Sequence, residues 1–441
     1  MESNIEVMKQ VFRLALPSII SNITIPLLGL IDLTIVGHMG DVVYIGAIAI
    51  GSMIFNVMYW LFGFLRMGTS GLTSQALGKR DFTEIMRHLF CSLLIGFIIA
   101  FTFIIFQTPI RWLALELMQP SPQISEQATI YFSICIWGAP AMLGLYGMTG
   151  WFIGMQNTRV PMVVSIFQNI INIIASLFFV YGFGMKVDGV ALGTLIAQWS
   201  GFVVAICCWY RYYRRLNRYP WTHKLLKKID LKRFFKVNTD IFIRTLFLVG
   251  VNFFFISAGA RQGDIILSVN TLLMTLFTLF SYVMDGFAYA GEALTGKYFG
   301  ANNKIGFDKV YRSLFAWGAL MALTFTLVYA LGGHHFLLLL TNERDVVEAA
   351  HDYFWWAVFI PIVGVSAFIY DGIFIGLTET KGMLVSSVIS AIAFFIFFIS
   401  LKKLLGNHAL WLAFLVYLAL RGFIQWILYR NMIPWSRISS K

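Results

Sequence analysis

The sequence predicts an all-α membrane protein with twelve transmembrane helices in two parallel, pseudo-symmetric six-helix bundles. Composition, the spacing of apolar segments and an internal repeat carry this prediction. The chain of 441 residues is 59% hydrophobic and 12% charged, with a mean hydropathy of +0.77, whereas a soluble domain carries roughly 25% charged residues. Stretches of about 20 apolar residues, long enough to cross a ~30 Å hydrocarbon core as a helix, recur along the chain.

The apolar segments are continuous rather than alternating, which favours helices over a β-barrel, because a helix satisfies its own backbone hydrogen bonds in lipid. The segment 211–239 is rich in Lys and Arg and is predicted to be a basic cytoplasmic linker between an N-terminal bundle (1–210) and a C-terminal bundle (240–441). The predicted spans are 10–36, 43–68, 87–109, 128–152, 160–182, 189–210, 240–259, 266–292, 311–332, 351–376, 384–402 and 409–430.

The distribution of positive charge predicts the orientation. Most of the 33 Lys and Arg residues fall in segments on the same side as the N-terminus, and such an excess marks cytoplasmic loops. Both termini are therefore predicted to be cytoplasmic. The net charge of +12 is explained in this way, so no nucleic-acid partner is expected. The four cysteines lie in apolar spans without CxxC spacing, which argues against a disulfide framework or a zinc site.

An internal repeat is visible in two pairs of segments. Residues 71–78 (GLTSQALG) resemble 293–300 (ALTGKYFG), and 150–158 (GWFIGMQNT) resemble 372–380 (GIFIGLTET). Both pairs are separated by 222 residues, about half the chain. Six spans per half is an even number, so the halves share one orientation, as in transporters built from parallel repeats. Two such halves predict a cavity between them and alternating access by rocking.

The first span contains a candidate gate. Ionisable side chains at membrane depth are costly and default to functional hypotheses, and Asp32 lies near the outer end of this span. Pro17 and Pro26 lie in the same span, where each removes a backbone donor and allows the helix to bend. The alternative is that Asp32 is simply solvated at the outer interface.

Spans five and six add neutral polar residues. Asn169, Asn172 and Ser176 are three and four residues apart and share one helix face, and Thr194 lies near the outer end of span six. With Asp32 they are predicted to line one hydrated pocket. We take Asp32, Asn172, Ser176 and Thr194 as the proton-coupling set and Asn169 as a substrate- or cation-binding candidate. Ordinary interhelical hydrogen bonding is the alternative.

The C-terminal half has its own ionisable residues. Counting ~1.5 Å per residue places Arg244, Glu292 and Asp371 in the inner half of the membrane. Arg244 is expected to pair with one of these carboxylates, and Glu292 is taken as its partner in a structural ion pair. Asp285 is deeper, and Asp371 aligns with Thr149 across the repeat. Asp285 and Asp371 are therefore candidates for substrate or cation binding.

The sequence contains no complete motif for covalent chemistry. GEALTGKY at 291–298 nearly matches a phosphate-binding loop, but Tyr298 replaces the Ser or Thr that binds magnesium. No HExxH motif occurs and no catalytic triad can be argued. We therefore predict that the protein is not an enzyme, has no catalytic residues and binds no metal or organic cofactor. Uphill transport would then be driven by a gradient of H⁺ or Na⁺.

Three segments carry a resemblance to a known family. They are RT…GARQGD…VMDGFAYAGEALTGKYFGANN (244–303), PSIISN…LIDLTIVGHMG (17–40) and the paired G-x-x-x-T motifs at 154–158 and 376–380. Together they resemble the DinF-like branch of the multidrug and toxic compound extrusion (MATE) family. The resemblance implies two six-helix bundles and cation-coupled efflux of amphipathic, often cationic, organic compounds.

The resemblance also implies roles for individual residues. Asp32 matches the acid implicated in proton coupling, and Pro17 stands at the family's bending proline. The span-five pattern N-x-x-N-x-x-x-D is matched by Asn169 and Asn172, but Ser176 replaces the acid. The N-terminal pocket would then hold one carboxylate rather than two. Tyr131 and Thr194 occupy pocket positions by spacing, which makes Tyr131 a further substrate- or cation-binding candidate.

These features favour a secondary antiporter, coupled to protons or sodium, that works as a monomer on small-molecule substrates in the lipid bilayer of the prokaryotic inner membrane. The rival hypothesis is a flippase for lipid-linked oligosaccharides, a related architecture. Its central cavity should be strongly basic, whereas few cations lie at midplane depth here. The antiporter hypothesis requires that Asp32 takes up and releases a proton near neutral pH.

Overall fold

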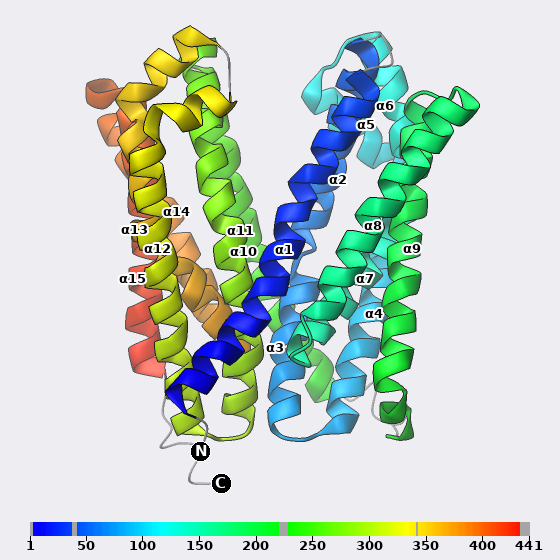
Figure 1. Ribbon diagram of the computed structural model, residues 1–441, viewed down its shortest axis with the longest axis vertical. Helices are drawn as coiled ribbons and strands as arrows, with labels where there is room; N and C mark the ends of the chain where they lie inside the picture. The colour runs from blue at the N-terminus through cyan, green and yellow to red at the C-terminus, as the bar shows by residue number, and fades with distance from the viewer. Residues whose placement is uncertain (1–2, 38–41, 220–227, 341–342, 433–441) are drawn as a thin grey trace. The chain divides into compact units, whose positions relative to one another are not determined.

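The computed structural model describes residues 3–37, 42–219, 228–340 and 343–432, and within them every regular element is helical (Figure 1). The first half contains α1 (Asn4–Gly37), α2 (Val42–Leu61), α3 (Phe64–Gly78), α4 (Phe82–Ile105), α5 (Gln107–Met118), α6 (Pro122–Cys135), α7 (Ala139–Gly154), α8 (Arg159–Leu177) and α9 (Val187–Tyr213). The second half contains α10 (Lys228–Ala260), α11 (Asp264–Gly300), α12 (Lys304–Leu340), α13 (Arg344–Leu377), α14 (Thr380–Leu405) and α15 (Asn407–Met432).

The helices confirm the predicted all-α membrane fold. Within the described residues, eleven helical segments are long and apolar enough to cross a membrane. Each overlaps one of the predicted spans, and the remaining predicted span, 10–36, falls in α1. Several helices run beyond the predicted boundaries, because their ends are polar and hydropathy marks only the part that suits lipid. One example is α11, which continues to Gly300.

Three local features depart from plain spans. The second span is interrupted between α2 and α3, and the fourth contains a short 3₁₀ turn, Ile136–Gly138, between α6 and α7. The loop predicted after the third span contains α5, whose 12 residues are too short to cross a bilayer. None of its residues is buried, and Trp112 and Leu117 are 63% and 77% exposed.

The chain divides into two compact units. The N-terminal unit comprises residues 20–234, and the C-terminal unit comprises residues 1–19 and 235–441. The predicted N-terminal bundle began at residue 1, whereas the contacts group the start of α1 with the second half of the chain. There, Phe12 stacks on Trp317 with ring centroids 4.9 Å apart, and the indole Nε1 of Trp317 donates to the carbonyl oxygen of Met8 at 3.2 Å.

Glycines show that the sequence repeat is also a repeat of packing. In the N-terminal unit, a Cβ atom on Gly150 of α7 would lie 2.1 Å from the carbonyl oxygen of Arg66 on α3. In the C-terminal unit, a Cβ on Gly372 of α13 would lie 2.4 Å from the carbonyl oxygen of Ala288 on α11. Both members of the second contact lie 222 residues after those of the first. Small residues at such positions let membrane helices approach closely.

A second pair of contacts follows the same spacing. A Cβ on Gly154 would lie 2.6 Å from the Cβ of Thr73, and a Cβ on Gly376 would lie 2.1 Å from the Oγ1 of Thr295. These glycines belong to the G-x-x-x-T motifs found in the sequence. The motifs therefore hold α7 against α3 in one unit and α13 against α11 in the other.

Candidate functional site

A buried polar network joins α8 and α9, which run side by side in the N-terminal unit (Figure 1). The amide Nδ2 of Asn172 donates to the hydroxyl of Thr194 at 3.1 Å, and the hydroxyl of Ser176 donates to Oδ1 of Asn172 at 3.5 Å. Asn172 and Ser176 are 1% and 0% exposed. The structure thus brings together three of the four residues of the predicted proton-coupling set.

The opposite face of α8 explains why these residues point inward. Ile170 and Ile174 are 49% and 58% exposed within the protein, so they face the lipid in a membrane. The polar residues lie on the other side of the helix at three- and four-residue spacings. Close packing holds α9 against them, since a Cβ on Gly193 would lie 2.3 Å from the hydroxyl oxygen of Ser176.

The same face of α8 contacts α1. The amide Nδ2 of Asn169 donates to the backbone carbonyl of Thr24 at 3.2 Å. The hydroxyl oxygens of Thr24 and Ser165 lie 3.3 Å apart. Thr24 is two residues before Pro26, so α8 holds α1 immediately before a position where that helix can bend. The side chains of residues 25–33, which include Pro26 and Asp32, lie outside the described part of the structure, although their backbone is helical.

Two further predicted residues have defined surroundings. Pro17 is a buried residue of α1. Two residues to either side of it, α1 contacts α11, because a Cβ on Gly286 would lie 2.9 Å from the carbonyl oxygen of Ala15 and 2.4 Å from the side chain of Ile19. Asp285, the residue before this glycine, is half-buried. The predicted cation-binding candidate on α11 therefore neighbours a close contact with α1 on both sides of Pro17.

Tyr131 lies on α6 and is 4% exposed. Its hydroxyl oxygen is 3.3 Å from the hydroxyl oxygen of Ser52 on α2. Its ring also fills the space beside Gly51, where a Cβ would lie 2.3 Å from a ring carbon. The described contacts thus pack Tyr131 between α6 and α2.

The C-terminal unit contains a buried ionic cluster on α10, α13 and α15. Arg244 and Arg421 each donate a hydrogen bond from Nη2 to the same oxygen, Oδ2 of Asp371, the second at 2.5 Å. Gln425 donates to the other carboxylate oxygen at 2.6 Å. Exposure is 4% for Arg244, 7% for Asp371 and 5% for Arg421. A carboxylate held in this way is a fixed partner of two guanidinium groups.

The predicted ion pair between Arg244 and Glu292 is wrong, because the ion pair of Arg244 is with Asp371. Glu292 is 1% exposed on α11. Depth along the membrane normal places these residues at similar levels, but it does not fix the direction in which each side chain leaves its helix. Sequence reasoning also missed Arg421 and Gln425. Their spacing of four residues within the last apolar span places both on one face and was an available signal.

Two bundles of membrane-spanning helices, related by a repeat and carrying buried polar residues, define the class of protein: a multi-pass membrane transporter. The MatE family model matches residues 17–178 and 241–399, so the chain belongs to the MatE family, the multidrug and toxic compound efflux transporters. The predicted membership is confirmed, and with it the prediction that the protein is a transporter and not an enzyme.

Individual relatives support this assignment. The chain is 37% identical over 414 residues to DNA damage-inducible protein F of Escherichia coli strain K12, which covers 94% of this chain and 90% of that protein. It is 23% identical to the probable multidrug resistance protein NorM of Idiomarina loihiensis, over 86% of this chain and 82% of that protein. A crystal structure of MATE in the bent conformation matches the fold with a TM-score of 0.86 at 18% identity and covers 100% of both chains. A crystal structure of MATE in the straight conformation has the same TM-score and identity and covers 99% of this chain and 97% of the solved chain.

Proposed function

We propose that this transporter is a proton-coupled antiporter that exports amphipathic or cationic organic compounds by alternating access. The observation that carries the proposal is the polar face of α8, where Asn172 and Ser176 form a network with Thr194 of α9. On the same face, Asn169 holds α1 at Thr24. The members of this network are neutral donors and acceptors, and they lie in the unit that contains Asp32. Asp32, the acid that titrates, would then lie on α1, the helix that bends.

Asp32 would be ionised while the protein takes up substrate and protonated when the cavity opens to the acidic side. Protonation removes a charge whose burial is costly, and α1 then bends near Pro17 or Pro26 and expels the substrate. Asn169 and Ser165 hold α1 at Thr24, so the bend at Pro26 would move the segment that follows, which carries Asp32.

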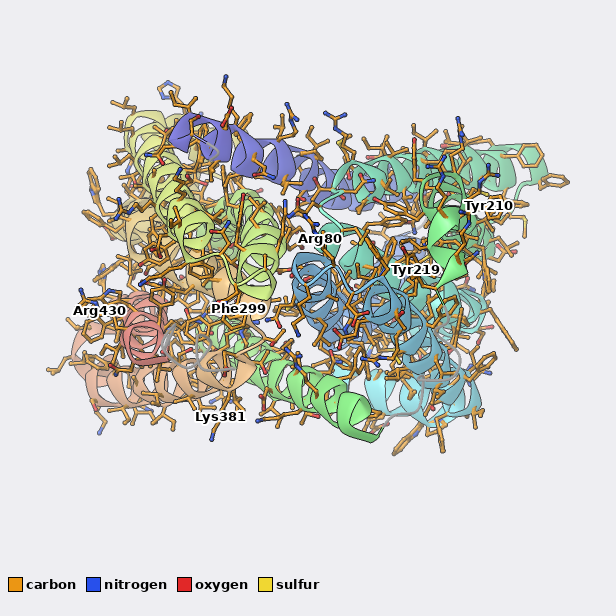
Figure 2. The ribbon with its side chains drawn as sticks, turned by 90° about the horizontal axis from the view of Figure 1, so that it is seen from below. Arg80, Tyr210, Tyr219, Phe299, Lys381 and Arg430 are labelled. Atoms are coloured by element: carbon orange, nitrogen blue, oxygen red, sulfur yellow. The ribbon has the colours of Figure 1, made fainter. Side chains whose placement is uncertain are left out.

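The proposed orientation of the protein in the membrane rests on the distribution of positive charge. In the C-terminal unit, Lys381 and Arg430 lie at the same end as Phe299, close to the end of α11 (Figure 2). In the N-terminal unit, Arg80 and Tyr219 share one end (Figure 2). Lys and Arg at these ends support a cytoplasmic location under the positive-inside rule. Both termini would then be in the cytoplasm of a prokaryotic cell, and the protein would act as a monomer in the inner membrane.

A second acid in the C-terminal unit would assist coupling. Asp371 is compensated by two guanidinium groups, which makes Asp285 the stronger candidate for binding a cation. Asp285 adjoins Gly286, which packs against α1 on both sides of Pro17. Binding or release of a proton at Asp285 would thus alter the contact between α11 and α1 close to the point where α1 bends. If both acids take part, neutralising them together reduces transport, whereas full transport by the double variant would confine coupling to the N-terminal unit.

The proposal is tested with purified protein in liposomes that carry a panel of organic cations. An imposed pH gradient, acidic on the side that receives the exported compound, should drive efflux, and a sodium gradient of equal size at constant pH should not. Efflux that follows sodium alone would replace the proton with sodium as the coupling ion. Absence of efflux under either gradient, together with protein-dependent movement of lipid-linked oligosaccharides, would favour the flippase.

A further inference from the structure

The ionic cluster on α10, α13 and α15 carries an excess of positive charge. One carboxylate, Asp371, faces two guanidinium groups, so the buried cluster has a net charge of +1. Among the described residues, the charged groups that act on Arg244 are Asp371 and Arg421, and Asp371 is the carboxylate that acts on Arg421. The two guanidinium groups converge on one oxygen atom and therefore repel each other at short range.

The cluster also has unused hydrogen-bond donors. The Nε atoms of Arg244 and Arg421 are both buried and make no hydrogen bond with any residue that the structure describes. A guanidinium has five N–H donors and no acceptor, and a buried donor without a partner is destabilising. Gln425 donates from Nε2 to Asp371; its Oε1 is buried without a hydrogen-bond partner among the described residues, and as a neutral acceptor it does not balance the charge. An anion beside the two Nε atoms would supply the missing negative charge and accept their hydrogen bonds.

The repeat offers a comparison, because the positions equivalent to these charged residues are uncharged. The positions 222 residues before Arg244, Asp371 and Arg421 are Asn22, Thr149 and Trp199. On α7, the equivalent of α13, Gly150 keeps the glycine contact with α3 although the adjacent Thr149 is uncharged. The ionic cluster is therefore a property that the C-terminal unit has and its counterpart lacks, which favours a role in binding over a role in holding the helices together.

We propose that Arg244 and Arg421 bind a small monoanion, a halide ion or a single carboxylate group, which completes the charge balance of the cluster. Guanidinium groups suit this task because they remain charged when buried and match a carboxylate with paired donors. The anion would come either from solution, as chloride, or from the carboxylate of a transported organic compound. The site goes beyond the proposed cation-coupled export, because it gives the C-terminal unit an affinity for negative charge.

The test measures thermal unfolding of the purified protein in detergent. Titrating chloride, bromide or acetate into a zwitterionic buffer should give a saturable rise in the unfolding temperature, whereas a bulky sulfonate at the same ionic strength should not. Arg244→Gln and Arg421→Gln should each remove this response, since either change leaves the cluster neutral. Asp371→Asn should do the opposite and tighten anion binding roughly tenfold, because the net charge rises to +2. A merely structural cluster would give three destabilised variants with unchanged response to the anion.

Controls keep this test decisive. Arg87→Gln removes another buried arginine, one that pairs with Glu84 at 3.1 Å in the N-terminal unit, and should leave the anion response intact. If an Arg→Gln variant does not fold, Arg421→Lys keeps the charge with fewer donors and should weaken the binding of acetate more than that of chloride. An equal response of wild type, Asp371→Asn and Arg421→Lys to the anion would overturn the proposal.

Two further experiments decide where the anion binds and where it comes from. Crystals grown in bromide should show an anomalous peak within hydrogen-bonding distance of both Nε atoms, and a peak elsewhere only would contradict the site. A small aromatic carboxylate should compete with bromide and, if substrates supply the anion, should itself be transported by wild type but not by Arg421→Gln. Competition without transport identifies chloride as the occupant. Proton-driven efflux of organic cations is measured separately, so either proposal can fail alone.

Discussion

The two units share helix packing but differ in their buried polar chemistry. In both units the glycine four residues before the G-x-x-x-T motif lies against a neighbouring backbone, at Gly150 and at Gly372. The N-terminal unit buries amides and hydroxyls, of which Asn172 and Thr194 are bonded at 3.1 Å. The C-terminal unit buries Asp371 between two arginines. The comparison teaches that small residues preserve the fold across the repeat, while the polar residues are free to acquire separate tasks.

The largest expected effect is a loss of stability when the ionic cluster of the C-terminal unit is broken. Asp371→Ala leaves two buried guanidinium groups without their carboxylate and should lower the free energy of unfolding by about 3–5 kcal/mol. Thr149→Ala, at the equivalent position of the N-terminal unit, should cost less than about 1.5 kcal/mol. Both are measured by thermal or denaturant unfolding in a zwitterionic buffer without added halide or carboxylate. Similar losses in the two variants would remove the contrast between the units.

The shared packing predicts the next effect. Gly150→Ala and Gly372→Ala each place a Cβ against a backbone carbonyl that cannot rotate away, so each should destabilise the protein by about 1–3 kcal/mol. A Cβ on Gly250 meets nothing within 4 Å, so Gly250→Ala serves as the control and should leave stability unchanged. If only one of the two variants is destabilised, the packing is not equivalent in the two units.

A smaller loss of stability is expected in the neutral network. Asn172→Ala breaks hydrogen bonds to Thr194 and Ser176 and should cost about 0.6–1.7 kcal/mol, the range for interhelical bonds in membranes. Its effect on proton-driven efflux should be much larger than this loss suggests, since Asn172 belongs to the proposed coupling set. Thr102→Ala removes an exposed hydroxyl bond within α4 and should change neither property. Normal efflux by Asn172→Ala would leave the network with a structural role only.

The sequence predicted the spans well and the side-chain partners less well. Length and hydropathy are enough to locate membrane helices, and the offset of 222 residues found in the sequence recurs in the glycine contacts. The partner of Arg244 was assigned wrongly because position along a helix does not determine the direction of a side chain. The exposed α5 was missed because its 12 residues fall between predicted spans. Tertiary contacts of α13 and α15 were needed to find Gln425 beside Asp371.

The central claim is that the acid on α1 couples transport to protons, and one measurement addresses it directly. Efflux of an organic cation from liposomes is followed under an imposed pH gradient for wild type, Asp32→Asn and Asp188→Asn, the last removing a half-buried acid at the start of α9. We expect Asp188→Asn to match wild type and Asp32→Asn to lose the response to the gradient while still binding the compound. Undiminished pH-driven efflux by Asp32→Asn would contradict the account.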